Sequence, residues 1–255
     1  MEKQPKAICV IPARMQSSRF PGKPLCLIGG KLMIQRVYES VAKSGYPTYI
    51  ATDHEDIKEA VLKFGGQCVM TSENHSTGTE RVKEAVDILF ANDSVQAEIV
   101  INIQGDEPFI HSDQIKNLVE EFDIELHQIL TLAKPFDPAP DKLIDDNKCC
   151  LVKDINNKVL YFSRLLVPYC RPGKTITKFL HLGIYAYRAD VLKKYVELPA
   201  SQIEQCESLE QNRWLENGGS IHVIETSYEN LSVDTQKDLE EIEQLISDKK
   251  ININD

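Results

Sequence analysis

Three cations lie close together in the stretch ICVIPARMQSSRFPGKPL, which covers residues 8–25. Arg14, Arg19 and Lys23 follow an apolar run that is short enough to form one buried strand. Cationic side chains neutralise an anion, and Gly22 lets the backbone approach it closely. A surface turn with solvated charges is the alternative. Because α/β sheets bind ligands at the carboxyl ends of their strands, we favour a phosphate-binding loop.

A pair of carboxylates follows a second apolar strand. The sequence IVINIQGDEPFI covers residues 99–110, and Asp106 and Glu107 stand directly after Gly105. Mg²⁺ prefers one or two carboxylates together with phosphate oxygens. The two side chains could instead only cap the next turn. Combined with the cationic loop, the pair indicates a metal ion that accompanies a polyphosphate.

Asp234 immediately precedes the last predicted helix, within Val233-Asp234-Thr235. On the sequence alone, the favoured interpretation is that Asp234 caps the N-terminus of this helix. A role as a second metal ligand, brought beside Asp106 by the fold, stays open.

A helix start rich in hydroxyl groups, HSTGTER, covers residues 75–81. Such a helix N-terminus offers backbone N–H groups to an anion or to the edge of a base. Thr77 and Glu80 also fit a capping box, so a structural explanation is strong. Arg81 lies one turn further along and could point at a phosphate.

The second half of the chain carries a looser set of polar residues. Arg164 at the end of a predicted strand could hold a carboxylate bidentately. His181, Glu210 and Gln211 could bind sugar hydroxyl groups. Each residue alone is better explained by a structural role, and only the joint pattern indicates a site.

Alternating apolar periods place these residues on an α/β scaffold. The first half predicts strands over 6–12, 48–52, 67–70 and 98–103 and helices over 31–44, 55–64, 78–90 and 113–122. This alternation calls for a mostly parallel sheet with helices on both sides. The second half predicts strands over 128–133, 149–153, 159–163, 180–187 and 221–225, loops over 135–147 and 167–177, and helices over 189–195, 201–214 and 235–247. No stretch resembles a linker, so we expect a single domain over 1–255 with an irregular insertion at 134–182.

Composition excludes several classes of protein. The 255 residues are 42% hydrophobic and carry a net charge of −10, which argues against a nucleic-acid surface but allows a local basic pocket. Seven cysteines without a CxxC pair indicate neither a zinc site nor a disulfide framework, but reduced, mostly buried thiols. The N-terminus lacks the apolar core of a signal peptide, and no apolar run reaches membrane-spanning length. We therefore expect a cytoplasmic protein.

The motifs as a set resemble the 3-deoxy-manno-octulosonate (Kdo) cytidylyltransferases, also called CMP-Kdo synthetases. In the order of that family, the chain contains PARMQSSRFPGKPL, ATDHEDI, HSTGTER, NIQGDEP, YFSR, HLGIYAY, LEQNR and VDT. The resemblance covers Ala7 to about Leu245. It implies a Rossmann-like fold of the nucleotide-diphospho-sugar transferase type, dependence on Mg²⁺, and a homodimer formed partly through residues 134–182.

The resemblance also implies roles for individual residues. Those that fall where the family binds CTP are Ala13, Arg14, Arg19, Lys23, Thr77, Gly78, Thr79 and Arg81. Within this set, Arg14 and Lys23 match phosphate contacts, and the segment 77–79 matches the cytosine contact. Asp106 and Asp234 match the metal ligands, and with Lys23 and Arg14 they form the expected catalytic set. The positions that match the site for the acidic sugar are Gln104, Arg164, His181, Tyr185, Glu210 and Gln211.

The implied reaction transfers CMP from CTP to the anomeric hydroxyl of Kdo and releases pyrophosphate, for lipopolysaccharide biosynthesis. Two departures stand out: Thr77 replaces the serine of the usual HQSGTER, and residues 229–232 replace a usual GTG, which could alter preference at the tail of the sugar. The 8-amino analogue of Kdo or another acidic sugar, such as a sialic acid, stays an alternative substrate. A non-catalytic nucleotide-binding protein is the alternative from a different class.

Overall fold

The computed structural model describes residues 6–16, 19–91, 95–137, 148–228 and 231–251. The chain forms two compact units, the first from Met1–Lys116 with Asn230–Asp255 and the second from Asn117–Glu229. The boundary near residue 116 falls inside helix α4 (Ser112–Glu120), where the sequence carries no linker signal.

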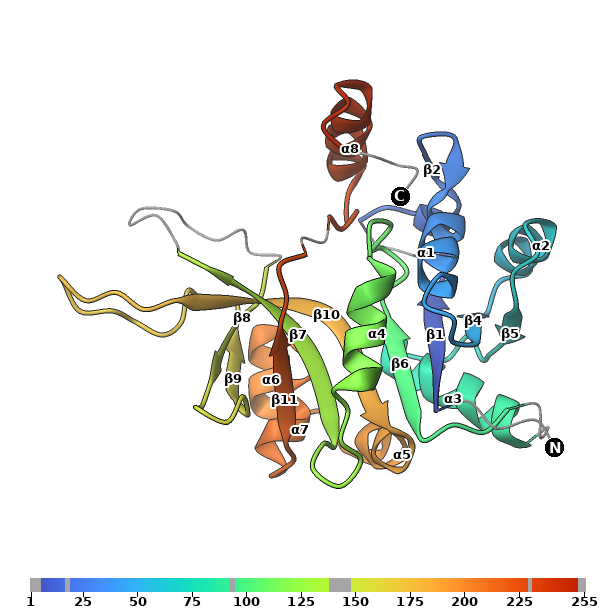
Figure 1. Ribbon diagram of the computed structural model, residues 1–255. Helices are drawn as coiled ribbons and strands as arrows, with labels where there is room; N and C mark the ends of the chain where they lie inside the picture. The colour runs from blue at the N-terminus through green and yellow to red at the C-terminus, as the bar shows by residue number, and fades with distance from the viewer. Residues whose placement is uncertain (1–5, 17–18, 92–94, 138–147, 229–230, 252–255) are drawn as a thin grey trace. The chain divides into compact units, whose positions relative to one another are not determined.

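Parallel strands form the centre of the first unit (Figure 1). In spatial order they are β6 (Ile99–Ile103), β1 (Ala7–Ala13), β4 (Thr48–Thr52) and β5 (Cys68–Met70). The helices of this unit are α1 (Met33–Ala42), α2 (Glu55–Lys63), α3 (Gly78–Ala91), the start of α4, α8 (Gln236–Ser247) and a short 3-10 helix η1 (Lys23–Leu25). The predicted parallel α/β architecture is confirmed here.

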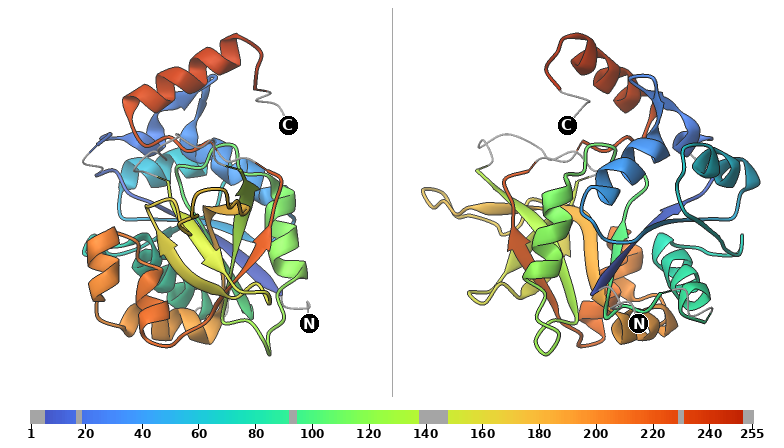
Figure 2. Two further views of the ribbon diagram at one scale, coloured as in Figure 1. Left: turned by 90° about the vertical axis from the view of Figure 1, so that its left-hand side faces the viewer. Right: turned by 45° about the vertical axis from the view of Figure 1, so that its right-hand side comes forward.

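Every residue of β1 and β6 is buried, which explains their continuous apolar runs. The right-hand view of Figure 2 shows why: α1 and α2 lie on one side of the strands and α3 lies on the other. A parallel sheet that is covered on both faces buries all the side chains of its central strands.

The C-terminal segment of the chain packs onto the hairpin formed by β2 (Leu27–Ile28) and β3 (Lys31–Leu32) and onto the start of α1. Val233 and Ile242 form an apolar cluster with Ile28 and Met33. Figure 1 shows α8 beside β2. This cluster fixes the segment just before α8 within the first unit, although more than 200 residues separate it from β2 in the sequence.

The second unit is a mixed sheet with three helices. Its strands are β7 (Ile129–Phe136), β8 (Cys150–Lys153), β9 (Val159–Ser163), β10 (Lys178–Arg188) and β11 (Ile221–Glu225). β7 pairs in parallel with β11 and antiparallel with β10, whereas β8 pairs antiparallel with β10 and β9. The helices are α5 (Ala189–Glu197), α6 (Gln202–Glu207) and α7 (Asn212–Glu216).

Several predicted elements differ from the structure. The helix expected over 201–214 is two helices, because Ser208 takes a left-handed conformation with φ of 51° and ends α6. Residues 31–32, expected to be helical, form β3. The expected irregular insertion at 134–182 contains β8, β9 and the start of β10, and most of the loop expected over 135–147 lies outside the described residues.

All seven cysteines lie in the described part of the chain and are free thiols. Cys9, Cys149 and Cys150 are buried, while Cys206 is exposed. Burial raises the pKa of the Cys9 thiol to about 12, so this residue behaves as a small apolar side chain. Among the described residues, no helix combines the length and the apolar character needed to cross a membrane.

Candidate active site

A polar cavity of about 230 Å³ opens at the carboxyl ends of β1 and β6 in the first unit. It gathers residues from five separate stretches of the sequence. Its lining includes Ala13, Arg14, Arg19, Lys23, His75, Thr77, Gly78, Arg81, Gln104, Gly105, Asp106 and Asp234. Most of the residues predicted to bind CTP, and both predicted metal ligands, therefore lie around one cavity.

The loop after β1 folds back on itself and presents Lys23 to the cavity. Gly22 adopts a left-handed φ of +73°, which a residue with a side chain rarely adopts. Its N–H donates to the carbonyl of Met15 at 3.1 Å and closes the loop. The chain then enters η1, where Pro24 in the first turn restricts the backbone directly after Lys23.

The Lys23 ammonium lies between the two predicted metal ligands. Its Nζ donates to Asp106 Oδ2 at 2.7 Å and to Asp234 Oδ1 at 3.4 Å. Only 14% of the lysine side chain is exposed, so solvent screens these ion pairs incompletely. Arg19 also contacts Asp234 at 3.0 Å, but it is more than half exposed.

Asp234 is not the N-cap of α8, so that interpretation of the sequence was wrong. Thr235 caps the helix and forms a capping box with Asp238. The backbone N–H of Val233 donates to the carbonyl of Asp106 at 3.0 Å. This bond sets the two short segments side by side, and the cap at the next residue leaves the Asp234 carboxylate to face Lys23.

Gly105 permits the close approach that places Asp106 at the cavity. A Cβ atom at this position would lie 2.8 Å from the carbonyl oxygen of Pro12, which is shorter than real Cβ contacts. The loop after β6 therefore packs directly against the end of β1, and a glycine is needed there.

The arrangement fits a divalent cation. Asp106 and Asp234 direct one oxygen each at a common point, which the Lys23 ammonium occupies. Among the described residues, no group of three His, Cys, Asp or Glu side chains could hold a metal ion by itself. Two carboxylates suit Mg²⁺, which completes its shell with water and phosphate oxygens.

The helix start at 75–81 forms the predicted capping box. Thr77 Oγ1 accepts the N–H of Glu80 at 3.2 Å, and Glu80 Oε2 accepts the N–H groups of Ser76 and Thr77. Thr77 and Gly78 line the cavity, whereas Thr79 is buried and is not part of the lining. Two of the backbone N–H groups expected to bind a ligand are thus engaged by Glu80.

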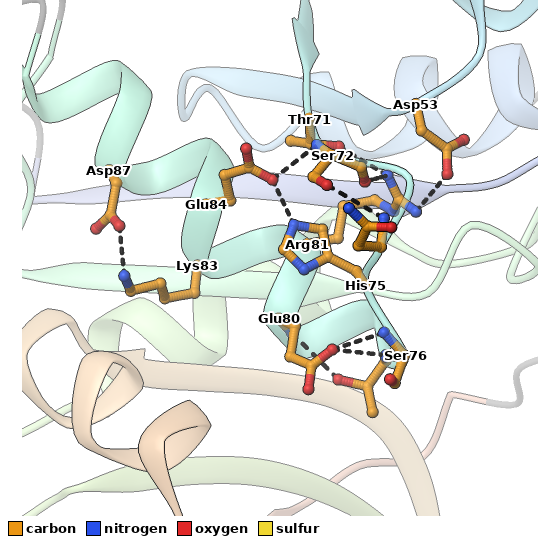
Figure 3. A network of polar contacts seen from close by, with 12 residues as sticks. Asp53, Thr71, Ser72, His75, Ser76, Glu80, Arg81, Lys83, Glu84 and Asp87 are labelled. Atoms are coloured by element: carbon orange, nitrogen blue, oxygen red, sulfur yellow. Dashed lines mark hydrogen bonds and ion pairs between the residues drawn. The ribbon is translucent and has the colours of Figure 1, made fainter.

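Arg81 lies at the cavity wall, but its guanidinium already has partners. Its Nη2 donates to Asp53 Oδ2 at 2.7 Å, and Nη1 donates to Thr71 Oγ1 at 2.7 Å and to the carbonyl of Ser72 at 3.1 Å (Figure 3). The side chain is 3% exposed. Its charge is neutralised by Asp53, a partner that the sequence analysis did not identify.

A second polar cavity of about 330 Å³ shares Arg14, His75 and Arg81 with the first. Asp53 and His54 also line it. Sequence reasoning missed Asp53 and His75 as cavity residues. The position of Asp53 directly after β4, the next strand beside β1, was the signal that could have found it.

The residues expected to bind the sugar divide between the two units. Gln104 lines the first cavity beside Asp106. In the second unit, the Arg164 side chain donates from Nε to the carbonyl of Glu207 at 2.7 Å and from Nη2 to that of Ser208 at 3.0 Å. These bonds fix the plane of the guanidinium.

The structure brings His181, Tyr185 and Gln211 together within the second unit. The ring centroids of His181 and Tyr185 lie 5.2 Å apart. The backbone N–H of His181 donates to the carbonyl of Cys149. The Sγ atom of Cys149 in turn lies 3.7 Å from Nε2 of Gln211. Burial lowers the pKa of His181 to about 3, so its imidazole is neutral at physiological pH. Glu210 lies near the group through its backbone carbonyl, which accepts from Tyr195 at 2.8 Å.

Comparison with known proteins connects these sites to a family. The family model described as cytidylyltransferase matches residues 8–227. The 3-deoxy-manno-octulosonate cytidylyltransferase of Parabacteroides distasonis is 46% identical over 245 residues, covering 92% of this chain and 96% of the relative. The protein of the same name from Thermodesulfovibrio yellowstonii is 42% identical over 250 residues, covering 94% and 98%.

A solved structure agrees with these relatives. The structure of CMP:2-keto-3-deoxy-manno-octonic acid synthetase complexed with CTP matches with a TM-score of 0.86 at 38% identity, covering 96% of this chain and 100% of that one. These matches cover nearly the whole chain, and the polar residues that line the cavity at the ends of β1 and β6 are consistent with them. The chain belongs to the cytidylyltransferase family.

Proposed function

We propose that this protein transfers CMP from CTP to the anomeric hydroxyl of Kdo and releases pyrophosphate, as a step of lipopolysaccharide biosynthesis. The observation that carries the proposal is the Lys23 ammonium held between Asp106 and Asp234 at the end of β1. The names and coverage of the relatives support the same substrates.

Arg14 and Lys23 would bind and orient the triphosphate. Arg14 is exposed at the cavity, and within the described part of the chain its guanidinium forms no ion pair. Lys23 extends from a loop that the hydrogen bond between Gly22 and Met15 and the ring of Pro24 restrict before a ligand arrives. Two cations at the leaving phosphates would stabilise the charge that develops as pyrophosphate departs, and positioning supplies much of the rate in phosphoryl transfer.

Asp106 and Asp234 would hold Mg²⁺, which when bound neutralises phosphate charge and lowers the pKa of a coordinated hydroxyl. The two carboxylates come from segments joined by the bond between Val233 and Asp106. Their separation is therefore fixed by the backbone and does not depend on flexible side chains alone.

We assign recognition of the sugar acid to the polar group of the second unit. The guanidinium of Arg164 is held by two carbonyls and is suited to a carboxylate. His181 is neutral, so it can hydrogen-bond a hydroxyl without adding charge. Replacing Arg164 by Ala should raise KM for the sugar and leave KM for CTP nearly unchanged.

A cytoplasmic homodimer is part of the proposal. Large apolar side chains within residues 134–182 are exposed, and they suit a contact with a second copy of the chain. They are Leu160, Leu165, Tyr169, Ile176 and Ile155. Sedimentation of the purified protein tests the homodimer directly. A species of monomer mass at micromolar concentration would contradict the homodimer.

A pyrophosphate-release assay with CTP, Mg²⁺ and Kdo tests the activity. We expect release only when all three are present and formation of CMP-Kdo in equal amount. Parallel reactions with the 8-amino analogue of Kdo and with a sialic acid identify the preferred sugar. Tight CTP binding without release for any sugar acid would favour the non-catalytic alternative.

A further inference from the structure

The loop over residues 71–77 forms part of the cavity wall, and three side chains of α3 hold it (Figure 3). Arg81 binds the start of the loop through Thr71 and Ser72. Glu80 binds the end of the loop through the N–H groups of residues 76 and 77. Both ends of the loop are therefore tied to the helix that follows it.

Glu84 contacts both the start and the middle of the same loop. Its Oε2 accepts the N–H of Ser72 at 2.8 Å and also contacts Nε2 of His75. Burial raises the pKa of Glu84, but the hydrogen bonds from His75 and Ser72 outweigh burial and lower it below the ordinary value. The carboxylate is thus ionised at neutral pH and acts only as an acceptor.

The carboxylate of Glu84 faces Nε2 of His75 and thereby determines which hydrogen bonds the other ring nitrogen, Nδ1, can form. Because Glu84 cannot donate, the hydrogen between the pair lies on Nε2, and the neutral tautomer that pairs with Glu84 in this way presents Nδ1 as an acceptor. Among the described residues, no protein group hydrogen-bonds Nδ1. His75 lines both cavities and is one-fifth exposed, so a ligand can reach it.

We propose that Glu84 is a positioning residue for the nucleotide: it fixes the His75 imidazole at the cavity wall so that Nδ1 accepts a hydrogen bond from the nucleoside of CTP. The inference rests on the proposed function. Two donors of CTP have the required chemistry, the exocyclic amine of cytosine and a ribose hydroxyl. Uracil carries a carbonyl in place of that amine, so an accepting Nδ1 at the base would favour CTP over UTP.

The test compares CTP affinity, measured by calorimetry without sugar, for wild type, Glu84→Ala, Glu84→Gln, His75→Ala and the double variant E84A/H75A. One net hydrogen bond corresponds to a change of roughly two- to twelvefold. We expect Glu84→Ala and His75→Ala each to weaken CTP binding by a factor in this range. The double variant should be no weaker than the single variants, because Glu84 acts through His75.

Glu84→Gln separates position from charge. Both contacts of Glu84 end on Oε2, and an amide oxygen in that place can accept the same two bonds. This variant should bind CTP nearly as well as wild type. Asp87→Asn is the matched control, because it removes the negative charge that pairs with Lys83 on the same helix without touching the loop.

The two possible donors give different results. If Nδ1 accepts from cytosine, His75→Ala lowers the ratio of CTP to UTP affinity. If Nδ1 accepts from the ribose 2′-hydroxyl, His75→Ala leaves that ratio unchanged. Wild type and His75→Ala should then bind 2′-deoxy-CTP with the same affinity. Both results support the proposal.

Three results would overturn it: wild-type affinity in His75→Ala, a double variant whose loss is the product of the single losses, or a loss in Glu84→Ala that matches the loss in Asp87→Asn. If Glu84→Ala does not fold, the measurements on His75→Ala and Glu84→Gln still decide. Failure of the wild-type protein to bind CTP at all would instead contradict the proposed function, so the two failures can be told apart.

Discussion

Replacing Lys23 by Met removes one ammonium and keeps most of the apolar stem. In the structure this ammonium contacts Asp106 at 2.7 Å and Asp234 at 3.4 Å. The substitution therefore acts on two equilibria at once. It removes a cation that would bind the triphosphate. Among the described residues, it also leaves Asp106 without a cationic partner and Asp234 with Arg19, which is more than half exposed.

The expected loss of CTP affinity follows from the value of a hydrogen bond to a charged group, about 1.5–3 kcal/mol, which corresponds to a factor between roughly 10 and 150. Turnover should fall as well, because the same ammonium would stabilise the departing pyrophosphate. Calorimetry with CTP and the pyrophosphate-release assay measure the two effects separately.

The expected effect on divalent cations has the opposite sign. Both carboxylate oxygens lie within 3.4 Å of Nζ, so the two oxygens are close neighbours. At about 6 Å and an effective dielectric constant near 20, two like charges repel by about 3 kcal/mol. A divalent ion relieves this repulsion, and no ammonium competes with it in the variant. Mn²⁺ titration followed by electron paramagnetic resonance, without nucleotide, should show tighter binding than in wild type.

Lys31→Met is the matched control, because Lys31 forms an exposed ion pair with Glu39 in the same unit, away from the cavity. It should change neither equilibrium. Unchanged CTP affinity in Lys23→Met would refute the phosphate role of the lysine. Unchanged or weaker Mn²⁺ binding would refute the argument that its ammonium occupies the position of the metal.

Other substitutions test neighbouring features of the molecule. Asp106→Asn should lower turnover by orders of magnitude and leave CTP affinity within a few fold, and near-normal turnover would contradict the metal assignment. Gly105→Ala should lower the free energy of unfolding by about 1–3 kcal/mol, because its Cβ would lie 2.8 Å from the Pro12 carbonyl; a melting temperature equal to wild type would argue against this packing. Burial raises the pKa of Glu204, but the paired Arg213 outweighs burial and lowers it, so this pair should stabilise the fold at neutral pH and lose its effect as the pH falls through the lowered pKa. Glu204→Gln should accordingly flatten the acid limb of the stability curve, and an unchanged limb would count against the pair.

The sequence predicted much of the first unit correctly because local signals were strong there. The strand at 48–52, the helix ended by the pair Gly65-Gly66 and the capping box at 77–80 appear as expected. The helix expected over 201–214 failed because a left-handed Ser208 breaks it, and serine gives no such signal in a sequence.

For the candidate site too, the sequence predicted some features correctly and the structure was needed for others. Residue types and order alone indicated a phosphate loop, a carboxylate after a buried strand and a family of nucleotide enzymes. The sequence favoured capping for Asp234 and allowed a phosphate contact for Arg81, because both patterns are local. The structure shows Thr235 as the cap in place of Asp234, and it adds Asp53 as a partner of Arg81.

The sequence by itself determined the kind of chemistry, since charge, hydroxyl groups and glycine positions are properties of the residues. Only the tertiary structure decided which charges meet. Asp106 and Asp234 share one ammonium because Val233 bonds to the backbone of Asp106 and packs with Ile28 and Met33. That packing depends on burial and backbone hydrogen bonds between segments that are far apart in the sequence, so no local pattern of residues predicts it.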